Sequence, residues 1–323
     1  MLIYKSMKNI ILLMTMAVGP VVSFAQNPAA EAETQTTTVA EQEHAPLILP
    51  PLFEYPVAPD DMPWRERSNW LVEHFWDNFD FKQKSVGQSQ LLHAFRTFVV
   101  PMHLADKDVA VKSVDALIKK IQKNPGLLLQ FTQAAERTIY DPQSADLMID
   151  EVYVRFLNAI AKNKKIPELR RVRYESQYAS LKDCLQGATM PSFTFTEKSG
   201  PKMTYTNTGV PTIIEFGDFD CTECRISRLR METDGELQEL VSQGKARILF
   251  ISPDVDPSEF ETWSKAVKGY PETWTVGVGE DLEDVLDLRT IPCIYLIDAS
   301  GNIVTKGATS DRAREFVKAE AAR

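Results

Sequence analysis

The chain is poor in histidine, and none of its 4 histidines follows His103. A cysteine nucleophile paired with a histidine base would therefore have to draw that base from the N-terminal half. His74, His93 and His103 share no metal-ligand spacing and form no HExxH pattern. We therefore expect neither histidine-based catalysis nor a histidine-held metal, and we expect no bound organic cofactor.

Positive charge is also in short supply. The chain has 36 Lys and Arg against 45 Asp and Glu, a formal net charge of -9. Residues 1–25 hold only Lys5 and Lys8, so the rest of the chain has 34 basic against 45 acidic side chains. An acidic chain is poorly suited to a phosphate backbone. No basic patch with interleaved aromatic residues is present, so we expect no nucleic-acid partner.

Cysteine is scarce as well: Cys184, Cys221, Cys224 and Cys293 are the 4 in the chain. A structural zinc site would need a second close-spaced pair, which the chain lacks. Four cysteines allow three full pairings, and the sequence does not choose among them. Cys184 and Cys293 could each be a third redox thiol or a small buried residue, and free cysteines are commonly the latter.

The N-terminus has the pattern of an export signal. Lys5 and Lys8 precede an apolar stretch, Ile10 to Val18, that is too short to span a membrane. Ser23 and Ala25 supply small residues at the positions before a cleavage site. We expect a signal peptide at residues 1–25 and a periplasmic protein that is soluble, with no membrane insertion, after cleavage. Disulfides persist in such a compartment.

Two segments of different character follow. Residues 26–61 are rich in Ala, Glu, Thr and Pro and predict a flexible linker. Residues 62–183 predict an all-α domain, because apolar residues recur at helical spacing. Aromatic residues between Trp64 and Phe81 could form a partner-binding surface, but their helical spacing favours a packed core.

From residue 188 to residue 323 strands and helices alternate. This pattern predicts a mixed sheet flanked by helices. Ser310 or Asp311 is placed to cap the last helix. The predicted strands are an edge strand at residues 190–195 and the strands at residues 210–216, 246–252, 293–297 and 303–306. The predicted helices are residues 225–241, 258–267, 282–288 and 310–321.

Cys221-Thr222-Glu223-Cys224 is the motif that carries chemistry. It follows a predicted strand and opens a predicted helix. A helix N-terminus has unpaired N–H groups and a partial positive charge, which favour a thiolate. The thiolate is the reactive form of cysteine. We therefore expect Cys221 to be the nucleophile and Cys224 to be the resolving thiol.

Two further positions fit this chemistry. Glu215 interrupts an apolar strand just before the motif, and burial would raise its pKa, so it is a candidate proton acceptor for Cys224. Its alternative is a carboxylate on a partly exposed face. Ile291-Pro292 enters the strand that begins at Cys293, where an X-Pro bond can be cis. We expect Ile291 and Pro292 to contact the backbone of a substrate.

Residues 188–323 resemble the thioredoxin-like fold in its secreted AhpC/TSA–TlpA-type thiol–disulfide oxidoreductase branch. The stretch IIEFGDFDC, from Ile213 to Cys221, carries the likeness. The resemblance places the family's buried acid at Glu215, its dithiol at Cys221 and Cys224, and its cis-proline at Pro292. Residues 253–280 fit the extra element of the TlpA-like branch.

The helical segment is similar to DUF5106, a domain found before such modules in Bacteroidetes proteins. Residues 140–144, Tyr153 and the stretch into Gly187 carry this second likeness. The resemblances together imply an α/β thioredoxin-like C-terminal domain preceded by an all-α domain. They bring no known chemistry for the helical part.

The motif also departs from the family. Glu223 stands where a proline often precedes the second cysteine, and Asp220 replaces an aromatic residue. Asp218, Asp220 and Glu223 disfavour a thiolate, so Cys221 should be less acidic than in a strong oxidant. We expect a periplasmic thiol–disulfide oxidoreductase that reduces or slowly exchanges protein or peptide disulfides, supplied by an unidentified electron donor. The alternative is a non-catalytic binding module in which Cys221 and Cys224 form a structural disulfide.

Overall fold

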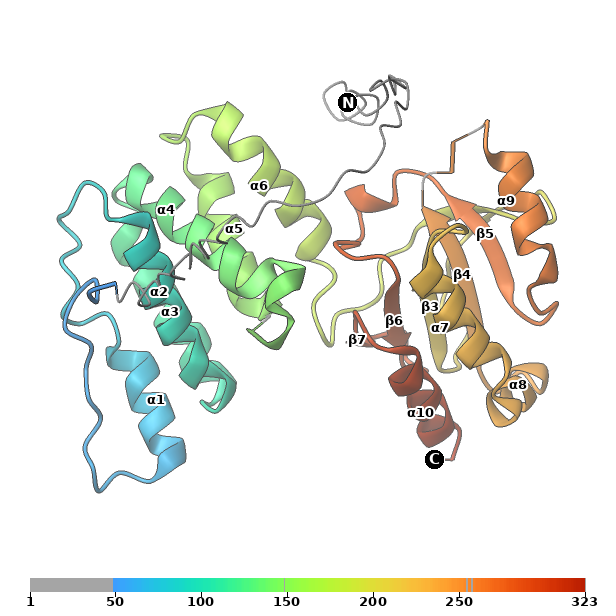
Figure 1. Ribbon diagram of the computed structural model, residues 1–323, viewed down its shortest axis with the longest axis horizontal. Helices are drawn as coiled ribbons and strands as arrows, with labels where there is room; N and C mark the ends of the chain where they lie inside the picture. The colour runs from blue at the N-terminus through green and yellow to red at the C-terminus, as the bar shows by residue number, and fades with distance from the viewer. Residues whose placement is uncertain (1–48, 148, 254, 257, 323) are drawn as a thin grey trace, which may run out of the picture. The chain divides into compact units, whose positions relative to one another are not determined.

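The computed structural model describes residues 49–147, 149–253, 255–256 and 258–322 (Figure 1). The predicted signal peptide and most of the predicted linker lie outside these residues. The described chain begins with a helical region and continues into a region built around a β-sheet.

The helical region forms because amphipathic segments bury their apolar faces against one another. Asn124, Pro125 and Gly126 open a helix: the side chain of Asn124 accepts hydrogen bonds from the N–H groups of Gly126 and Leu127, at 3.1 and 3.2 Å. The elements are α1 (Trp64–His74), α2 (Gln88–Val99), the 3-10 turn η2 (Val100–His103), α3 (Lys107–Ile121), α4 (Pro125–Ala135), the π-helical turn η3 (Glu136–Tyr140), the 3-10 segment η4 (Pro142–Leu147), α5 (Asp150–Lys162) and α6 (Glu168–Leu181).

The aromatic residues that precede and follow the end of α1 belong mostly to the core of this region. Phe75, Trp76 and Phe79 are buried there together with Phe98 and Phe131. The rings meet mainly edge to face, the arrangement that aromatic pairs prefer. By contrast, Trp64 is 66% exposed. The aromatic stretch is therefore a packed core at most of its positions.

The helical core begins before residue 62, which corrects the expected end of the linker. Phe53 packs its ring against Phe75 and Trp76, with centroids 5.7 and 5.4 Å apart. Leu52 and Tyr55 also pack on this core. The prolines near these residues favour an extended chain, but the apolar side chains between them pack against the helical core.

The second region contains one mixed sheet. Within the described residues its strand order is β2-β1-β5-β4-β3-β6-β7. The central strands β3, β4 and β5 are parallel, and the other pairings are antiparallel. The strands are β1 (Thr194–Glu197), β2 (Lys202–Thr204), β3 (Thr212–Phe216), β4 (Arg247–Pro253), β5 (Thr275–Gly279), β6 (Cys293–Ile297) and β7 (Ile303–Thr305).

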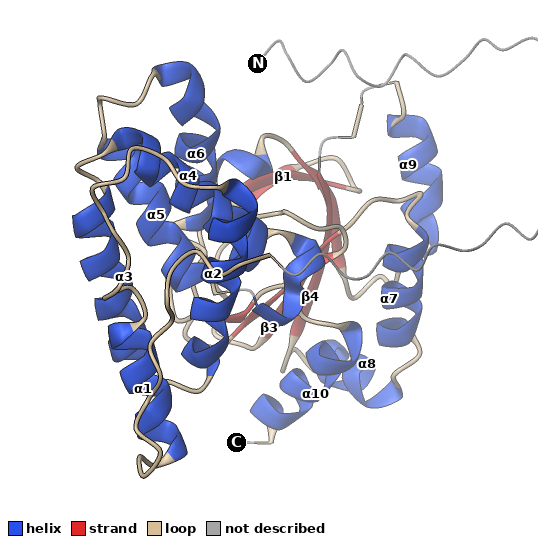
Figure 2. Ribbon diagram, turned by 60° about the vertical axis from the view of Figure 1, so that its left-hand side comes forward, coloured by secondary structure: helices blue, strands red, loops and turns tan. Residues whose placement is uncertain are grey.

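The helices α7 (Thr222–Glu232), α8 (Gly235–Ser242), α9 (Phe260–Ala266) and α10 (Ser310–Ala321) pack on one core (Figure 2). This core contains Met231 of α7, Trp263 of α9 and Val317 of α10. The opposite face of the sheet is covered by the chain around Phe193 and by the 3-10 turn η6 (Leu282–Asp284). This arrangement leaves the end of β3 and the start of α7 at one edge of the sheet.

Several element boundaries differ from the sequence expectation. The helix expected at residues 225–241 is two helices, because Asp234 accepts a hydrogen bond from Leu237 N–H at 3.1 Å and starts α8. The helix expected at residues 282–288 is only the short turn η6. Thr309, rather than Ser310 or Asp311, caps α10 by accepting from Arg312 N–H at 3.2 Å. No helix among the described residues is long and apolar enough to cross a membrane.

Candidate functional site

The site is built where β3 ends. All five residues of β3 are buried, and the strand lies between parallel β4 and antiparallel β6. A loop of four residues, 217–220, follows the strand and leads to Cys221 at the start of α7. Gly217 is the first residue of this loop. A fixed central strand followed by a short loop holds the first turn of α7 in a defined position.

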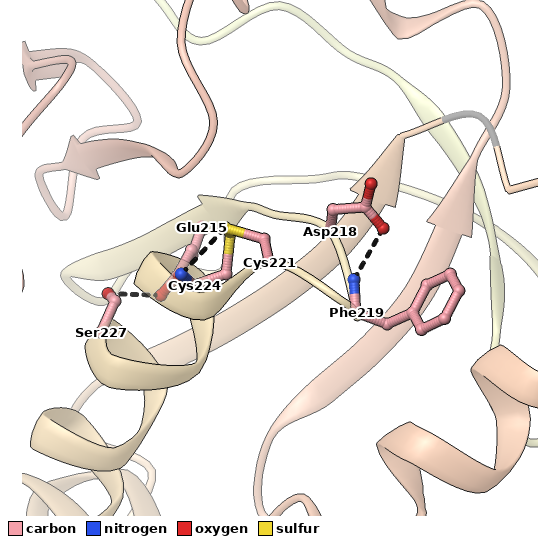
Figure 3. The surroundings of a disulfide bond; sticks show 6 residues. All are labelled: Glu215, Asp218, Phe219, Cys221, Cys224 and Ser227. Atoms are coloured by element: carbon pink, nitrogen blue, oxygen red, sulfur yellow. Dashed lines mark hydrogen bonds between the residues drawn. A yellow bond between two sulfur atoms is a disulfide. The ribbon is translucent and has the colours of Figure 1, made fainter. Parts of the chain in front are cut away.

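Cys221 and Cys224 form a disulfide at the N-terminus of α7 (Figure 3). Their Cα atoms are 5.3 Å apart. Cys221 is the N-cap residue and is partly exposed, whereas Cys224 lies inside the helix and is 1% exposed. The two sulfur atoms therefore differ in access to solvent, and only the first can be reached by a large partner.

The helix end acts directly on the first sulfur. Sγ of Cys221 accepts a hydrogen bond from the backbone N–H of Cys224 at 3.1 Å. The free N–H groups of the first helical turn carry a partial positive charge, so this position stabilises a thiolate on Cys221 when the disulfide is open.

Three acidic residues lie close to Cys221 in the sequence. Asp218, Asp220 and Glu223 are all exposed. The carboxylate of Asp218 accepts a hydrogen bond from Phe219 N–H at 2.8 Å, which fixes the loop before the disulfide (Figure 3). These charges oppose the effect of the helix end, although exposure to water weakens each of them.

Gly217, which the sequence analysis did not single out, makes room for Cys224. A Cβ atom at Gly217 would lie 3.3 Å from Sγ of Cys224 and 2.9 Å from Cε2 of Phe250. Glu215 is two residues earlier in the chain, and alternate positions of a strand share one face. Glu215 therefore points to the same side of the sheet as Cys224. A glycine directly after a buried strand was the signal that could have identified this position.

Glu215 is a buried carboxyl group with a single described hydrogen bond. Its side chain is fully buried, and Ser227 donates to Oε2 at 3.0 Å. No described residue bonds its other oxygen, Oε1. Burial raises the pKa of Glu215 to about 8, although Ser227 and the nearby Arg228 lower it. The group can therefore hold or accept a proton near neutral pH, which an ordinary glutamate cannot.

Ser227 is a second residue that the sequence analysis missed. It lies three positions after Cys224, so both side chains belong to one face of α7. That face is turned toward Glu215 (Figure 3). The helical spacing from Cys224 was the available signal, but a serine in a helix is too common to be recognised without the strand beside it.

Ile291 and Pro292 lie at the same edge of the sheet. Cys293, the next residue, pairs with Phe216 at the end of β3. Since β3 and β6 are antiparallel, the chain that enters β6 meets the chain that leaves β3. The Ile291–Pro292 peptide bond is cis, and Ile291 is 39% exposed.

The other two cysteines lie elsewhere. Cys184 and Cys293 are free and buried, in the core on the sheet face opposite α7. Burial raises the pKa of Cys293 to about 12 and also raises that of Cys184. A buried thiol that keeps its proton is a poor nucleophile. Within the described part of the chain, no group of three His, Cys, Asp or Glu side chains is arranged to hold a metal.

These observations define the class of protein. The order of the strands, the disulfide at the start of α7 and the proline entering β6 define a thioredoxin-like fold, and a helical region precedes it. A crystal structure of a thioredoxin-like protein from Bacteroides caccae has this fold over 83% of this chain and 98% of its own. The two proteins are 21% identical, and the TM-score is 0.69.

The family of the helical region follows from its sequence. Residues 25–183 match the family model described as a domain of unknown function, DUF5106. A match to DUF5106 thus precedes the part of the chain that has the thioredoxin-like fold. No curated protein matches the chain.

Two other solved structures are similar to part of the chain. One is the thioredoxin domain of a thiol-disulfide oxidoreductase from Bacteroides vulgatus, which is 20% identical with a TM-score of 0.35 and covers 42% of this chain and 96% of that one. The other is a putative thiol:disulfide interchange protein DsbE from Chlorobium tepidum, which is 18% identical with a TM-score of 0.35 and covers 42% of this chain and 98% of that one.

Proposed function

We propose that this protein is a thiol–disulfide oxidoreductase that acts on protein or peptide disulfides through Cys221 and Cys224. The observation that carries the proposal is the position of Cys221. Its sulfur is partly exposed, lies at the N-terminus of α7 and accepts the Cys224 N–H at 3.1 Å. A purely structural disulfide would not require one sulfur to be accessible at a helix end.

The reaction has two exchange steps. The Cys221 thiolate attacks one sulfur of a substrate disulfide, forms a mixed disulfide and releases one substrate thiolate. Cys224 then loses its proton to Glu215 and attacks Cys221, which releases the second substrate thiolate. Two electrons pass to the substrate, and the protein is left with the Cys221–Cys224 disulfide. A dithiol donor must reduce that disulfide before the next cycle.

The substrate would lie against Cys221 and the segment at Ile291 and Pro292. Their proximity at one edge of the sheet supports this, because the residue after Pro292 pairs with the last residue of β3. Backbone groups of that segment can bond an extended peptide whatever its sequence. No organic cofactor takes part in the proposed cycle.

The charges near the motif support one direction of electron flow. Asp218, Asp220 and Glu223 repel negative charge on Cys221, so the reduced form of the pair is less favoured than in an oxidant with a very acidic thiol. We infer a reductant or a slow exchanger. We also infer export to the periplasm, from the pattern of residues 1–25, and a C-terminal redox domain at residues 188–323.

The experiment is disulfide exchange by the purified chain without residues 1–25, measured as insulin reduction and as equilibrium with glutathione. We expect Cys221→Ser to abolish exchange and Cys224→Ser to accumulate a mixed disulfide that mass spectrometry detects. Cys184→Ser is the matched control and should retain exchange. Unchanged exchange in Cys221→Ser would contradict the proposal.

The same experiment tests the alternative of a non-catalytic module. A potential far below about -300 mV together with no exchange by the wild-type chain identifies a structural disulfide. In that case the DUF5106 domain would be the part that recognises a partner.

A further inference from the structure

Four charged side chains lie together between the helical region and the chain that leads to Ile291 and Pro292. We call Asp150, Asp287, Arg289 and Lys306 the charge cluster. Asp150 is the first residue of α5 in the helical region. The other three belong to the sheet region, and Arg289 is two residues before Ile291.

Arg289 bonds residues of both regions. Its guanidinium donates to Oδ1 of Asp150 at 2.7 Å and, through Nε, to both carboxylate oxygens of Asp287 at 3.2 and 3.1 Å. It also donates to the backbone oxygen of Tyr140 at 3.3 Å and lies 3.9 Å from the centre of that ring. One side chain thus joins two segments of the helical region to its own loop.

Lys306, the residue that follows β7, completes the cluster. Its ammonium contacts Oδ2 of Asp150 at 3.0 Å and also the carboxylate of Asp287. The Tyr140 hydroxyl donates to Oδ1 of Asp287 at 3.3 Å. Two cations therefore face two carboxylates, and each cation bonds both acids.

The cluster is shielded from water, so its geometry matters. The side chains of Asp287 and Arg289 are 2% and 11% exposed. Burying charges is unfavourable unless each is paired in good geometry, and removal of one partner leaves an uncompensated charge. An open pocket of about 190 Å³ reaches Asp287 and Arg289 and is lined in part by Gln177, Ser180 and Leu288.

The other side of the same loop is fixed to the sheet. The backbone oxygen of Asp287 accepts hydrogen bonds from the Tyr295 hydroxyl at 2.9 Å and from Sγ of Cys293 at 3.8 Å. The chain from residue 287 to residue 292 is thus held by β6 on one side and by Asp150 and Tyr140 on the other. A change in the helical contacts would be transmitted to Ile291.

We propose that Asp150, acting through Arg289 and Lys306, positions the segment that carries Ile291 and Pro292 for a disulfide-bearing peptide. The DUF5106 domain then serves as a support for the redox site. The effect on substrate rests on the proposed function, whereas the effect on the segment does not. Asp150 and Arg289 are positioning residues, since neither would touch the reacting sulfurs.

The first test is hydrogen–deuterium exchange of the full chain without residues 1–25, because it requires no activity. We expect Asp150→Asn to speed exchange of amides in residues 286–297 by at least about fivefold, with α2 and α7 unchanged. Asp115→Asn is the matched control, because Asp115 pairs with Arg155 inside the helical region. Exchange in residues 286–297 equal to that of the control would overturn the proposal, and so would an equal loss of protection in α2.

A milder variant covers the case in which Asp150→Asn does not fold. Tyr140→Phe removes only the hydroxyl that bonds Asp287 and keeps the ring beneath Arg289. It should speed exchange in residues 286–297 in the same direction. If this variant folds and leaves those amides unchanged, the helical region does not position the segment.

The second test is kinetic and uses an oxidised peptide as substrate. Asp150→Asn should raise KM about tenfold and leave kcat within about twofold, since it disturbs docking and not the sulfurs. Asp150→Glu, which keeps a carboxylate, should recover part of the loss. A fall in kcat at unchanged KM would overturn the positioning role. If the wild-type chain exchanges no disulfides, the proposed function fails, and the hydrogen exchange result still decides whether the helical region holds the segment.

Discussion

Ser227 on α7 donates a hydrogen bond to Oε2 of Glu215 on β3, with the two oxygens 3.0 Å apart. The bond joins the helix that carries the disulfide to the central strand beneath it. It satisfies one oxygen of a fully buried carboxyl group, and no described residue bonds the other. Glu215 is therefore held in place, but its carboxyl group is removed from water and only half hydrogen-bonded. For this reason it keeps its proton near neutral pH.

The stability of the protein should depend on the pH through Glu215. Its folded pKa of about 8 lies above the ordinary value of 4.5, so the folded state holds a proton that the unfolded state has released between these values. The stabilisation is complete below pH 4.5 and is lost as the pH rises through about 8. At about 1.4 kcal/mol per pKa unit, the shift corresponds to about 5 kcal/mol. Urea unfolding at pH 5 and pH 8.5 should show Glu215→Gln losing less stability than the wild type.

An exposed residue supplies the control for that measurement. Glu223→Gln removes one carboxylate from the surface beside the disulfide. It should leave the difference between the two pH values close to that of the wild type. A Glu215→Gln protein with the same pH dependence as the wild type would mean that Glu215 is ionised in the folded state across this range.

The pH dependence of disulfide exchange should also reveal the titration of Glu215. If Glu215 accepts the proton of Cys224, the resolving step speeds up as the pH rises through about 8. Ser227→Ala removes a bond that favours the charged form, so this inflection should move to higher pH. Stopped-flow measurements from pH 6 to pH 10 would follow it. The inflection should be absent in Glu215→Gln and near its original position in Ser227→Thr, and a profile unaffected by Glu215→Gln would exclude the proton transfer.

A side chain at position 217 should crowd Cys224 and the ring of Phe250. The added Cβ of Gly217→Ala would lie 2.9 Å from Phe250 and 3.3 Å from Sγ of Cys224. Overpacking of this kind costs about 1–3 kcal/mol, and we expect slower exchange as α7 shifts. Gly235→Ala is the control, since no atom lies within 4 Å of its added Cβ. Thermal unfolding of both variants, with exchange rates, tests this, and two indistinguishable variants would contradict it.

Local sequence was enough to predict most of the sheet region. The apolar stretches at β3, β4 and β6 identify buried strands because few polar residues interrupt them. Two strands were not predicted from the sequence: the short β2, Lys202–Thr204, and β5, Thr275–Gly279. The two glycines of β5 lower its strand propensity. The reason for Gly277 is tertiary: a Cβ there would lie 2.6 Å from the ring of Phe195 on β1.

The residues of the site also divide into those that local sequence indicates and those that only tertiary contacts bring together. Cys221, Cys224 and Glu215 lie within ten residues of one another, so one motif and one strand bring them to notice. Asp150 and Arg289 are 139 residues apart, and neither stands in a recognisable pattern. Their pairing depends on how α5 meets the loop before β6. Charged residues are also common on surfaces, so composition did not indicate that these two pair in a partly buried position.

Phe53 should matter for the stability of the helical region although it precedes α1. Its ring packs edge to face against Phe75, and it is only partly buried. Phe53→Ala should therefore cost about 2–3 kcal/mol, somewhat less than a fully buried phenylalanine. Val57→Ala is the control, because Val57 is 83% exposed and should change little. Denaturant unfolding can be followed by tryptophan fluorescence, to which Trp76 contributes together with the other four tryptophans. The ring centroid of Trp76 lies 5.4 Å from that of Phe53. Equal stability of the two variants would mean that residues 49–61 are a linker to their end and add nothing to the helical core.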